Sequence, residues 1–199
     1  IFPSILVAWS PFGGANNGTR VITSKSAFSL KSPNALLRNP HGAVNLTAGD
    51  FVGEGLPLII AAQGLGGNNQ IRVLQYREVD GKRKLEYVGQ FQGLRGMAAR
   101  TNGSGGTSVA AGDVDGDGLD ELVVGQMNGE GAATLYQVID LEMSGASVVP
   151  ARWTDPVFGM PEGYRGLGGV NLAVGDVDGD GNNEIIVATA GIPNGADDN

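Results

Sequence analysis

The sequence contains no cysteine, so it can form neither disulfide bonds nor thiolate metal sites. Basic residues are few: 13 Lys and Arg face 21 Asp and Glu, for a formal net charge of -8. Because phosphate backbones are bound by clustered Lys and Arg, this charge argues against nucleic acid as a partner. No apolar run is long enough for a membrane-spanning helix.

Glycine, by contrast, is abundant, with 34 residues against 9 prolines and no collagen-like period. A hydrophobic content of 41% is typical of a globular protein. Together these values favour many short strands joined by tight turns. The sequence begins at Ile1 rather than at Met, so we expect either that a signal has been removed or that this is a piece of a longer protein.

One segment of about twenty residues occurs three times without gaps. The copies are NLTAGDFVGEGLPLIIAAQG (45–64), SVAAGDVDGDGLDELVVGQM (108–127) and NLAVGDVDGDGNNEIIVATA (171–190). Their first aspartates, Asp50, Asp113 and Asp176, follow one another at intervals of 63 residues. A fixed period of this length indicates a duplicated structural unit.

Each unit is predicted to hold four antiparallel strands. The first leads into the acidic loop and the second, such as EIIVATA at 184–190, leaves it as an apolar run typical of a strand buried on both faces. A hairpin follows, with strands at 71–80 and 84–91 in one unit and at 133–140 and near 147–153 in the next. Four such strands form a propeller blade.

We therefore expect an all-β chain of propeller-type blades, with helix limited to one turn at 34–39. As a single repeat domain over 1–199, it divides into a partial blade (1–44), a blade with a degenerate loop (45–107), a blade with a calcium loop (108–170) and a partial blade with a calcium loop (171–199). This amounts to about three and a half blades, whereas propellers close at roughly four to eight.

The complete loops have the spacing of a metal cage. In the first loop, side-chain carboxylates occupy positions 1, 3, 5 and 9, and position 7 offers a backbone carbonyl: Asp113, Asp115, Asp117, Glu121 and Leu119. The second loop supplies Asp176, Asp178, Asp180, Glu184 and the carbonyl of Asn182. An all-oxygen set of this kind suits Ca²⁺, and we expect two sites.

An EF-hand loop shares the DxDGDG opening but requires a carboxylate at position 12 and flanking helices. Position 12 is Val124 in one loop and Val187 in the other, and the flanks are short and rich in branched residues. The EF-hand interpretation is therefore excluded. Solvated turns are the other alternative, but four converging carboxylates would repel one another without a cation.

The third loop departs from this pattern. Positions 3 and 9 are Val52 and Leu58, which leaves only Asp50 and Glu54 as acidic residues. We expect a degenerate loop that keeps its turn and binds calcium weakly or not at all.

The motif D-x-D-G-D-G-x-x-E, followed by an apolar strand at blade spacing, resembles the FG-GAP (VCBS-type) repeat family. This family includes the calcium-binding blades of integrin α-subunit propellers and of many bacterial secreted proteins. The resemblance implies that calcium bridges the turn between the first and second strands of a blade. The same loop residues would then be its ligands.

These observations predict a non-enzymatic, extracellular scaffold or adhesion protein stabilised by calcium. The carboxylates are used as ligands, and the one histidine, His41, has no identifiable catalytic partner. The incomplete end blades suggest assembly with other subunits into a ring or filament. A surface protein or a glycan is the other kind of partner expected. The alternative is a carbohydrate-binding module or a fragment of a polysaccharide-active enzyme. A sugar-stacking surface would then be formed by Trp9, Trp153, Tyr87 and Tyr164, but we expect these aromatic side chains to pack between blades instead.

Three sequons, at Asn17, Asn45 and Asn102, offer sites for N-glycosylation in a secreted protein. Asn45 is the poorest of these candidates because it lies in a predicted strand.

Overall fold

The fold is known from a computed structural model. It describes three N-terminal strands by their backbone and, beyond them, residues 44–53, 55, 57–64, 69–79, 82–95, 106–127, 135–158 and 169–189. The helical turn expected at 34–39 lies outside these residues, as do His41, Tyr164, Asn17, Asn102 and the side chain of Trp9.

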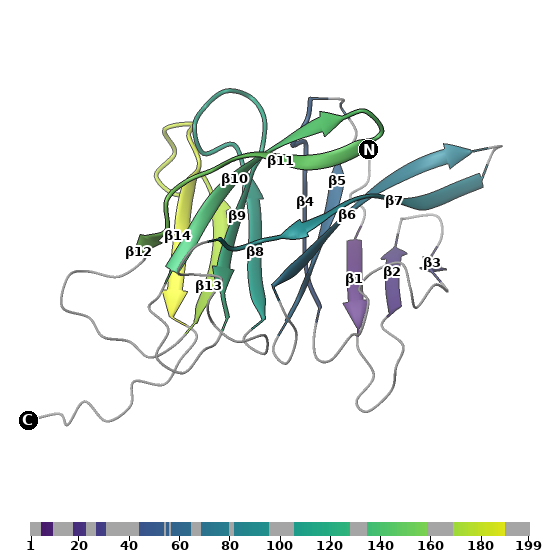
Figure 1. The fold of residues 1–199 in the computed structure, drawn as a ribbon, viewed down its shortest axis with the longest axis horizontal. Helices are drawn as coiled ribbons and strands as arrows, with labels where there is room; N and C mark the ends of the chain where they lie inside the picture. Colours follow the sequence, from purple (N-terminus) through teal and green to yellow (C-terminus); the bar gives the residue numbers. More distant parts are fainter. Residues whose placement is uncertain are drawn as a thin grey trace, which may run out of the picture.

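The elements form four antiparallel sheets (Figure 1). The first holds β1 (Ile5–Trp9), β2 (Gly18–Ile22) and β3 (Ala27–Leu30). The second holds β4 (Val44–Gly49), β5 (Leu58–Gln63), β6 (Gln70–Val79) and β7 (Lys82–Gln92). The third holds β8 (Thr107–Gly112), β9 (Glu121–Gln126), β10 (Leu135–Ser144), β11 (Ser147–Trp153) and β12 (Val157–Phe158), and the fourth holds β13 (Val170–Gly175) and β14 (Glu184–Thr189). The all-β prediction is confirmed for the described residues.

The sequence repeat is also a structural repeat. The first strands of the last three sheets, β4, β8 and β13, begin at Val44, Thr107 and Val170, which keeps the spacing of 63 residues. In the two larger sheets the first four strands pair in chain order, as in a propeller blade, and the short strand β12 pairs with β10. The predicted hairpins are confirmed as β6–β7 and β10–β11.

The sheets follow one another in chain order. Strand β1 lies against β4, β4 against β8, and β8 against β13. The sheet β1–β2–β3 and the sheet β13–β14 therefore lie at opposite ends of the row (Figure 1). The described sheets form an open row of blades and do not close into a ring.

The main core lies between the second and third sheets. Apolar side chains of β5 face those of β8 and β9, and all are buried: Leu58, Ile60, Ala62, Val109, Leu122 and Val124. Burying one such aliphatic side chain contributes about 1.5–3 kcal/mol. Trp153 of β11 also joins this contact, with its ring edge-on to Phe91 of β7 and the Arg95 guanidinium over its face.

Trp153 therefore packs between blades, as expected, whereas the expectation is wrong for Tyr87, which is 53% exposed.

The strand that follows each loop was predicted to be buried on both faces. This prediction is right for β5 and β9 but wrong for β14. Ile186 of β14 is 40% exposed. The difference in burial comes from the packing of the sheets, because β5 and β9 are each covered by a following sheet and no described sheet covers β14.

Candidate metal centres

Both complete loops connect the first and second strands of a sheet, and their backbone is shaped by glycines at positions 4 and 6. Gly116 and Gly118 have φ angles of 80° and 91°, and Gly179 and Gly181 have φ angles of 83° and 93°. Residues with a Cβ rarely adopt this left-handed conformation, so glycine allows the loop to curl back on its first aspartate.

In the loop between β8 and β9, the Asp113 carboxylate accepts two backbone hydrogen bonds. Its Oδ1 accepts a hydrogen bond from the Gly116 N–H at 2.7 Å, and its Oδ2 accepts one from the Gly118 N–H at 3.0 Å. Glu121, at the far end of the loop, accepts from the Val114 N–H at 2.8 Å. The loop is thus closed around its own carboxylates.

The loop between β13 and β14 repeats these contacts. Asp176 accepts from the Gly179 N–H at 2.7 Å and from the Gly181 N–H at 3.0 Å, and Glu184 accepts from the Val177 N–H at 2.9 Å. The corresponding distances in the two loops agree within about 0.1 Å. The same motif therefore produces the same geometry in two different blades.

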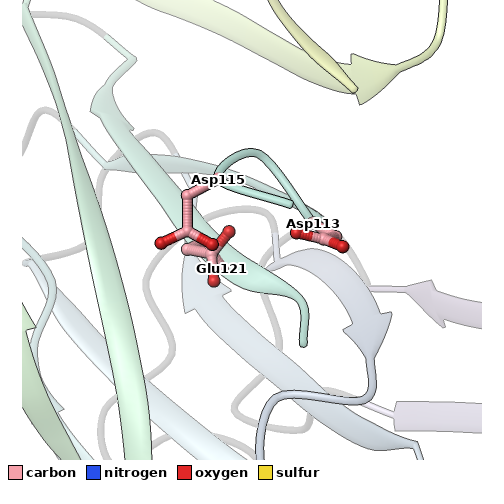
Figure 2. A group of neighbouring side chains, drawn as sticks. All are labelled: Asp113, Asp115 and Glu121. Carbon is pink, nitrogen blue, oxygen red and sulfur yellow. The ribbon is translucent and has the colours of Figure 1, made fainter. Parts of the chain in front are cut away.

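Three carboxylates converge in each loop. Asp113, Asp115 and Glu121 each offer an oxygen within 4.8 Å of the others, and Asp176, Asp178 and Glu184 do the same. Figure 2 shows the Asp115 and Glu121 carboxylates side by side, with Asp113 on the same loop. Because Ca²⁺ binds oxygen at about 2.3–2.6 Å, ligands on opposite sides of the ion lie about 5 Å apart or less. The donor chemistry and spacing fit this ion.

The position 5 aspartates are not members of these groups. Asp117 instead accepts a hydrogen bond from the Leu119 N–H at 2.8 Å, and Asp180 accepts one from the Asn182 N–H at 2.8 Å. Asp117, Asp180 and the carbonyls of Leu119 and Asn182 thus remain predicted ligands.

Glu121 is a buried acid at the end of the first loop, and its pKa is raised. Its side chain is only 4% exposed, and burial, followed by the charges of Asp115, Asp117 and Asp113, raises its pKa to about 7. The hydrogen bond from Val114 opposes this shift. Since a cation favours the ionised carboxylate, metal binding would displace the proton that Glu121 otherwise holds below that pH.

Two residues near this loop were not identified from the sequence. Arg152 of β11 lies with its Nη2 3.5 Å from Asp115 Oδ2, and its Nε donates to Asp140 at 2.6 Å. The hydrogen bond with Asp140 raises the pKa of Arg152 further. Asp120, at position 8, accepts from the Asp50 N–H of the preceding blade at 2.7 Å. Neither contact has a local sequence signal, because each depends on how the strands and sheets are placed.

The degenerate loop keeps its turn, as predicted. Gly53 and Gly55 have positive φ angles of 72° and 67°, and the Gly53 N–H donates to Asp50 Oδ1 at 3.0 Å. Leu58, which replaces the glutamate of position 9, is 1% exposed and belongs to the core. Glu54 lies outside the described residues.

Asn45 is already engaged inside the protein. Its Nδ2 donates to the Thr107 carbonyl at 2.7 Å and lies 2.7 Å from Met127 Sδ. A glycan on this nitrogen would remove the hydrogen bond between β4 and β8, which agrees with the expectation that Asn45 is the poorest of the three sequons.

Comparison with known families identifies the segment that carries the first complete loop. Residues 105–136, which include β8, the loop and β9, match the model of the FG-GAP repeat. This segment is therefore similar to an FG-GAP repeat. This agrees with the resemblance seen in the sequence, and FG-GAP repeats are associated with calcium binding. The search of curated proteins and the search of solved structures each returned no match.

Proposed function

We propose that this protein is an extracellular scaffold or adhesion module whose FG-GAP blades are stabilised by calcium. The observation that carries the proposal is the repetition of one loop geometry in two blades, each with three converging carboxylates and the same closing hydrogen bonds. FG-GAP repeats occur in extracellular and surface proteins, where calcium is abundant. Among the described residues, no helix has the length and apolarity needed to span a bilayer.

The role of calcium is structural. Without a cation, each loop holds several negative charges close together, which opposes folding. An ion that binds the folded loop and not the unfolded chain stabilises the protein by mass action, by about 2.7 kcal/mol for each site when its concentration is a hundredfold above Kd. The carboxylates are then all engaged as ligands, and none is left as an acid or base for catalysis.

The partners that suit such a module are proteins or glycans at a cell surface. The open row of sheets adds self-assembly, because the end sheets leave strand edges and faces that a second subunit can cover. A head-to-tail contact of this kind produces a ring or a filament.

Thermal unfolding in calcium and in chelator tests the role of the metal. We expect chelator to lower Tm by about 10 °C or more, given two sites and about 2–4 °C per kcal/mol for a chain of this size. The double variant Asp115→Ala, Asp178→Ala should melt at the low temperature in both buffers. The matched control is Asp155→Ala, an exposed aspartate outside the loops, which should keep the full response. An unchanged Tm of the native chain in chelator would contradict the proposal.

A further inference from the structure

The degenerate loop between β4 and β5 is fixed mainly by apolar packing. Phe51 at position 2 and Leu58 at position 9 are each 1% exposed and belong to the main core. The Gly53 N–H closes the turn on Asp50 Oδ1 at 3.0 Å. This loop therefore has a defined shape although it lacks two of the four carboxylates of a complete loop.

The degenerate loop contacts positions 7 and 8 of the first complete loop, in the next blade. The Asp120 N–H donates to the Asp50 carbonyl at 3.0 Å, and the Asp50 N–H donates to Asp120 Oδ2 at 2.7 Å. A Cβ on Gly49 would lie 2.5 Å from Asp120 Oδ2, and a Cβ on Gly53 would lie 3.2 Å from Leu119 Cδ2. Glycine at these two positions therefore leaves the space that the side chains of the next loop occupy.

The second complete loop lacks this close contact with the loop before it. Its position 7 is Asn182, which is exposed, and a Cβ on Gly116 of the preceding loop would meet no described atom within 4 Å. At position 8, a Cβ on Gly112 would lie 3.4 Å from Asn183 Nδ2, which is an ordinary van der Waals distance. The close contact is thus a property of the degenerate loop and the first complete loop.

The contacted residues lie beside predicted calcium ligands. Asp120 is flanked by Leu119, whose carbonyl is a predicted ligand, and by Glu121, whose carboxylate belongs to the converging group. The beginning of the loop is fixed from within, because Asp113 accepts two glycine N–H groups. Positions 7 and 8 are fixed in addition by the preceding blade. A site whose ligands are already in place binds an ion at a smaller ordering cost.

We propose that the degenerate loop positions the calcium ligands of the next loop, with Asp120 as the positioning residue. The inference deepens the role of calcium in the proposed function and rests on it. The two hydrogen bonds with Asp50 hold the backbone between Leu119 and Glu121 before the ion binds. A loop without a full set of carboxylates thus contributes to the calcium affinity of its neighbour.

Calcium titration by calorimetry, on full chains with one intact complete loop, tests this inference. Asp178→Ala leaves the first complete loop intact, and Asp115→Ala leaves the second. In the Asp178→Ala chain, Gly49→Ala should raise Kd about tenfold, because its methyl group displaces the Asp120 carboxylate and changes no charge. The matched control is Gly175→Ala, at the same repeat position, where a Cβ meets no described atom within 4 Å and Kd should stay unchanged.

Two substitutions of Asp120 separate its hydrogen bond from its charge. Asp120→Ala and Asp120→Asn both remove the negative charge, but only asparagine keeps an acceptor for the Asp50 N–H. In the Asp178→Ala chain, Kd should rise about tenfold in Asp120→Ala and about threefold or less in Asp120→Asn. Equal increases in the two variants, or an unchanged Kd in Gly49→Ala, would overturn the inference.

The same substitutions in the Asp115→Ala chain show whether the effect is local. Gly49→Ala and both Asp120 variants should leave Kd of the second complete loop unchanged, whereas a general loss of stability would weaken both sites. Equal effects at the two loops would overturn the inference and leave calcium binding intact. A native chain that binds no calcium would contradict the proposed function as well. The Tm of each variant in calcium shows that it is folded at the temperature of the titration.

Discussion

Asp120 and Asp50 form two hydrogen bonds with each other between neighbouring blades. The Asp120 N–H donates to the Asp50 carbonyl at 3.0 Å, and the Asp120 carboxylate accepts from the Asp50 N–H at 2.7 Å. These two hydrogen bonds connect the first residue of the degenerate loop to position 8 of the first complete loop. We therefore regard Asp120 as a positioning residue that keeps the two loops in register.

Asp120→Ala should lower the free energy of unfolding by about 1–3 kcal/mol, because the Asp50 N–H loses a charged acceptor in a partly buried contact. The change is measured by urea unfolding in calcium. Asp120→Asn keeps an acceptor of the same shape and should lose less. Equal losses in the two variants would mean that the hydrogen bond is not the source of the stabilisation.

Gly112 and Gly175 form a matched pair for blade packing. Gly112→Ala inserts a methyl group against Val174, and overpacking of this kind costs about 1–3 kcal/mol. Gly175→Ala adds the same group at the same repeat position, where it meets no described atom within 4 Å, and should leave the stability of the monomer unchanged. The comparison is made by thermal unfolding of dilute protein. Equal effects in the two variants would contradict the account of the internal interface.

The metal-free protein should become less stable as the pH rises from about 4.5 to about 7. Burial raises the pKa of Glu121 from 4.5 to about 7, so the folded state holds the proton more tightly than the unfolded chain does. The stabilisation is fully present below the unfolded pKa and is lost as the pH passes through about 7. The loss amounts to about 3 kcal/mol.

Urea unfolding in chelator at several pH values measures this effect. Glu121→Gln keeps the shape of the neutral side chain and should remove the pH dependence in this window. Glu142→Gln, at an exposed position of β10, is the control and should retain it. In calcium the sign is reversed, because protons compete with the ion for Glu121, and affinity should fall below about pH 7.

Arg152 places a positive charge beside a predicted calcium ligand. Its Nη2 lies 3.5 Å from Asp115 Oδ2, so it should repel an ion bound there. Arg152→Ala should tighten binding at the first loop by about two- to fivefold at low ionic strength, and salt should reduce this gain because the side chain is exposed. Calcium titration at two salt concentrations checks the effect. The loop at 176–184 serves as the internal control, and an equal change there would contradict a local cause.

The sequence predicted those features that depend on neighbouring residues. The repeat at Asp50, Asp113 and Asp176, the strands on either side of each loop and the convergence of the carboxylates at positions 1, 3 and 9 all follow from local spacing. The exposure of Ile186 does not, because its apolar run is like those of β5 and β9 and only the next sheet decides whether it is buried. The contacts of Arg152 and Asp120 likewise depend on the packing of strands and blades. They could be found only in the folded chain.

Calcium titration of the metal-free protein by calorimetry tests the central claim most directly. The account predicts two ions bound by each chain, one lost in Asp115→Ala and the other in Asp178→Ala. It also predicts that the degenerate loop adds no ion of comparable affinity. A native chain that binds no calcium at about millimolar concentrations, the range of extracellular sites, would contradict the account.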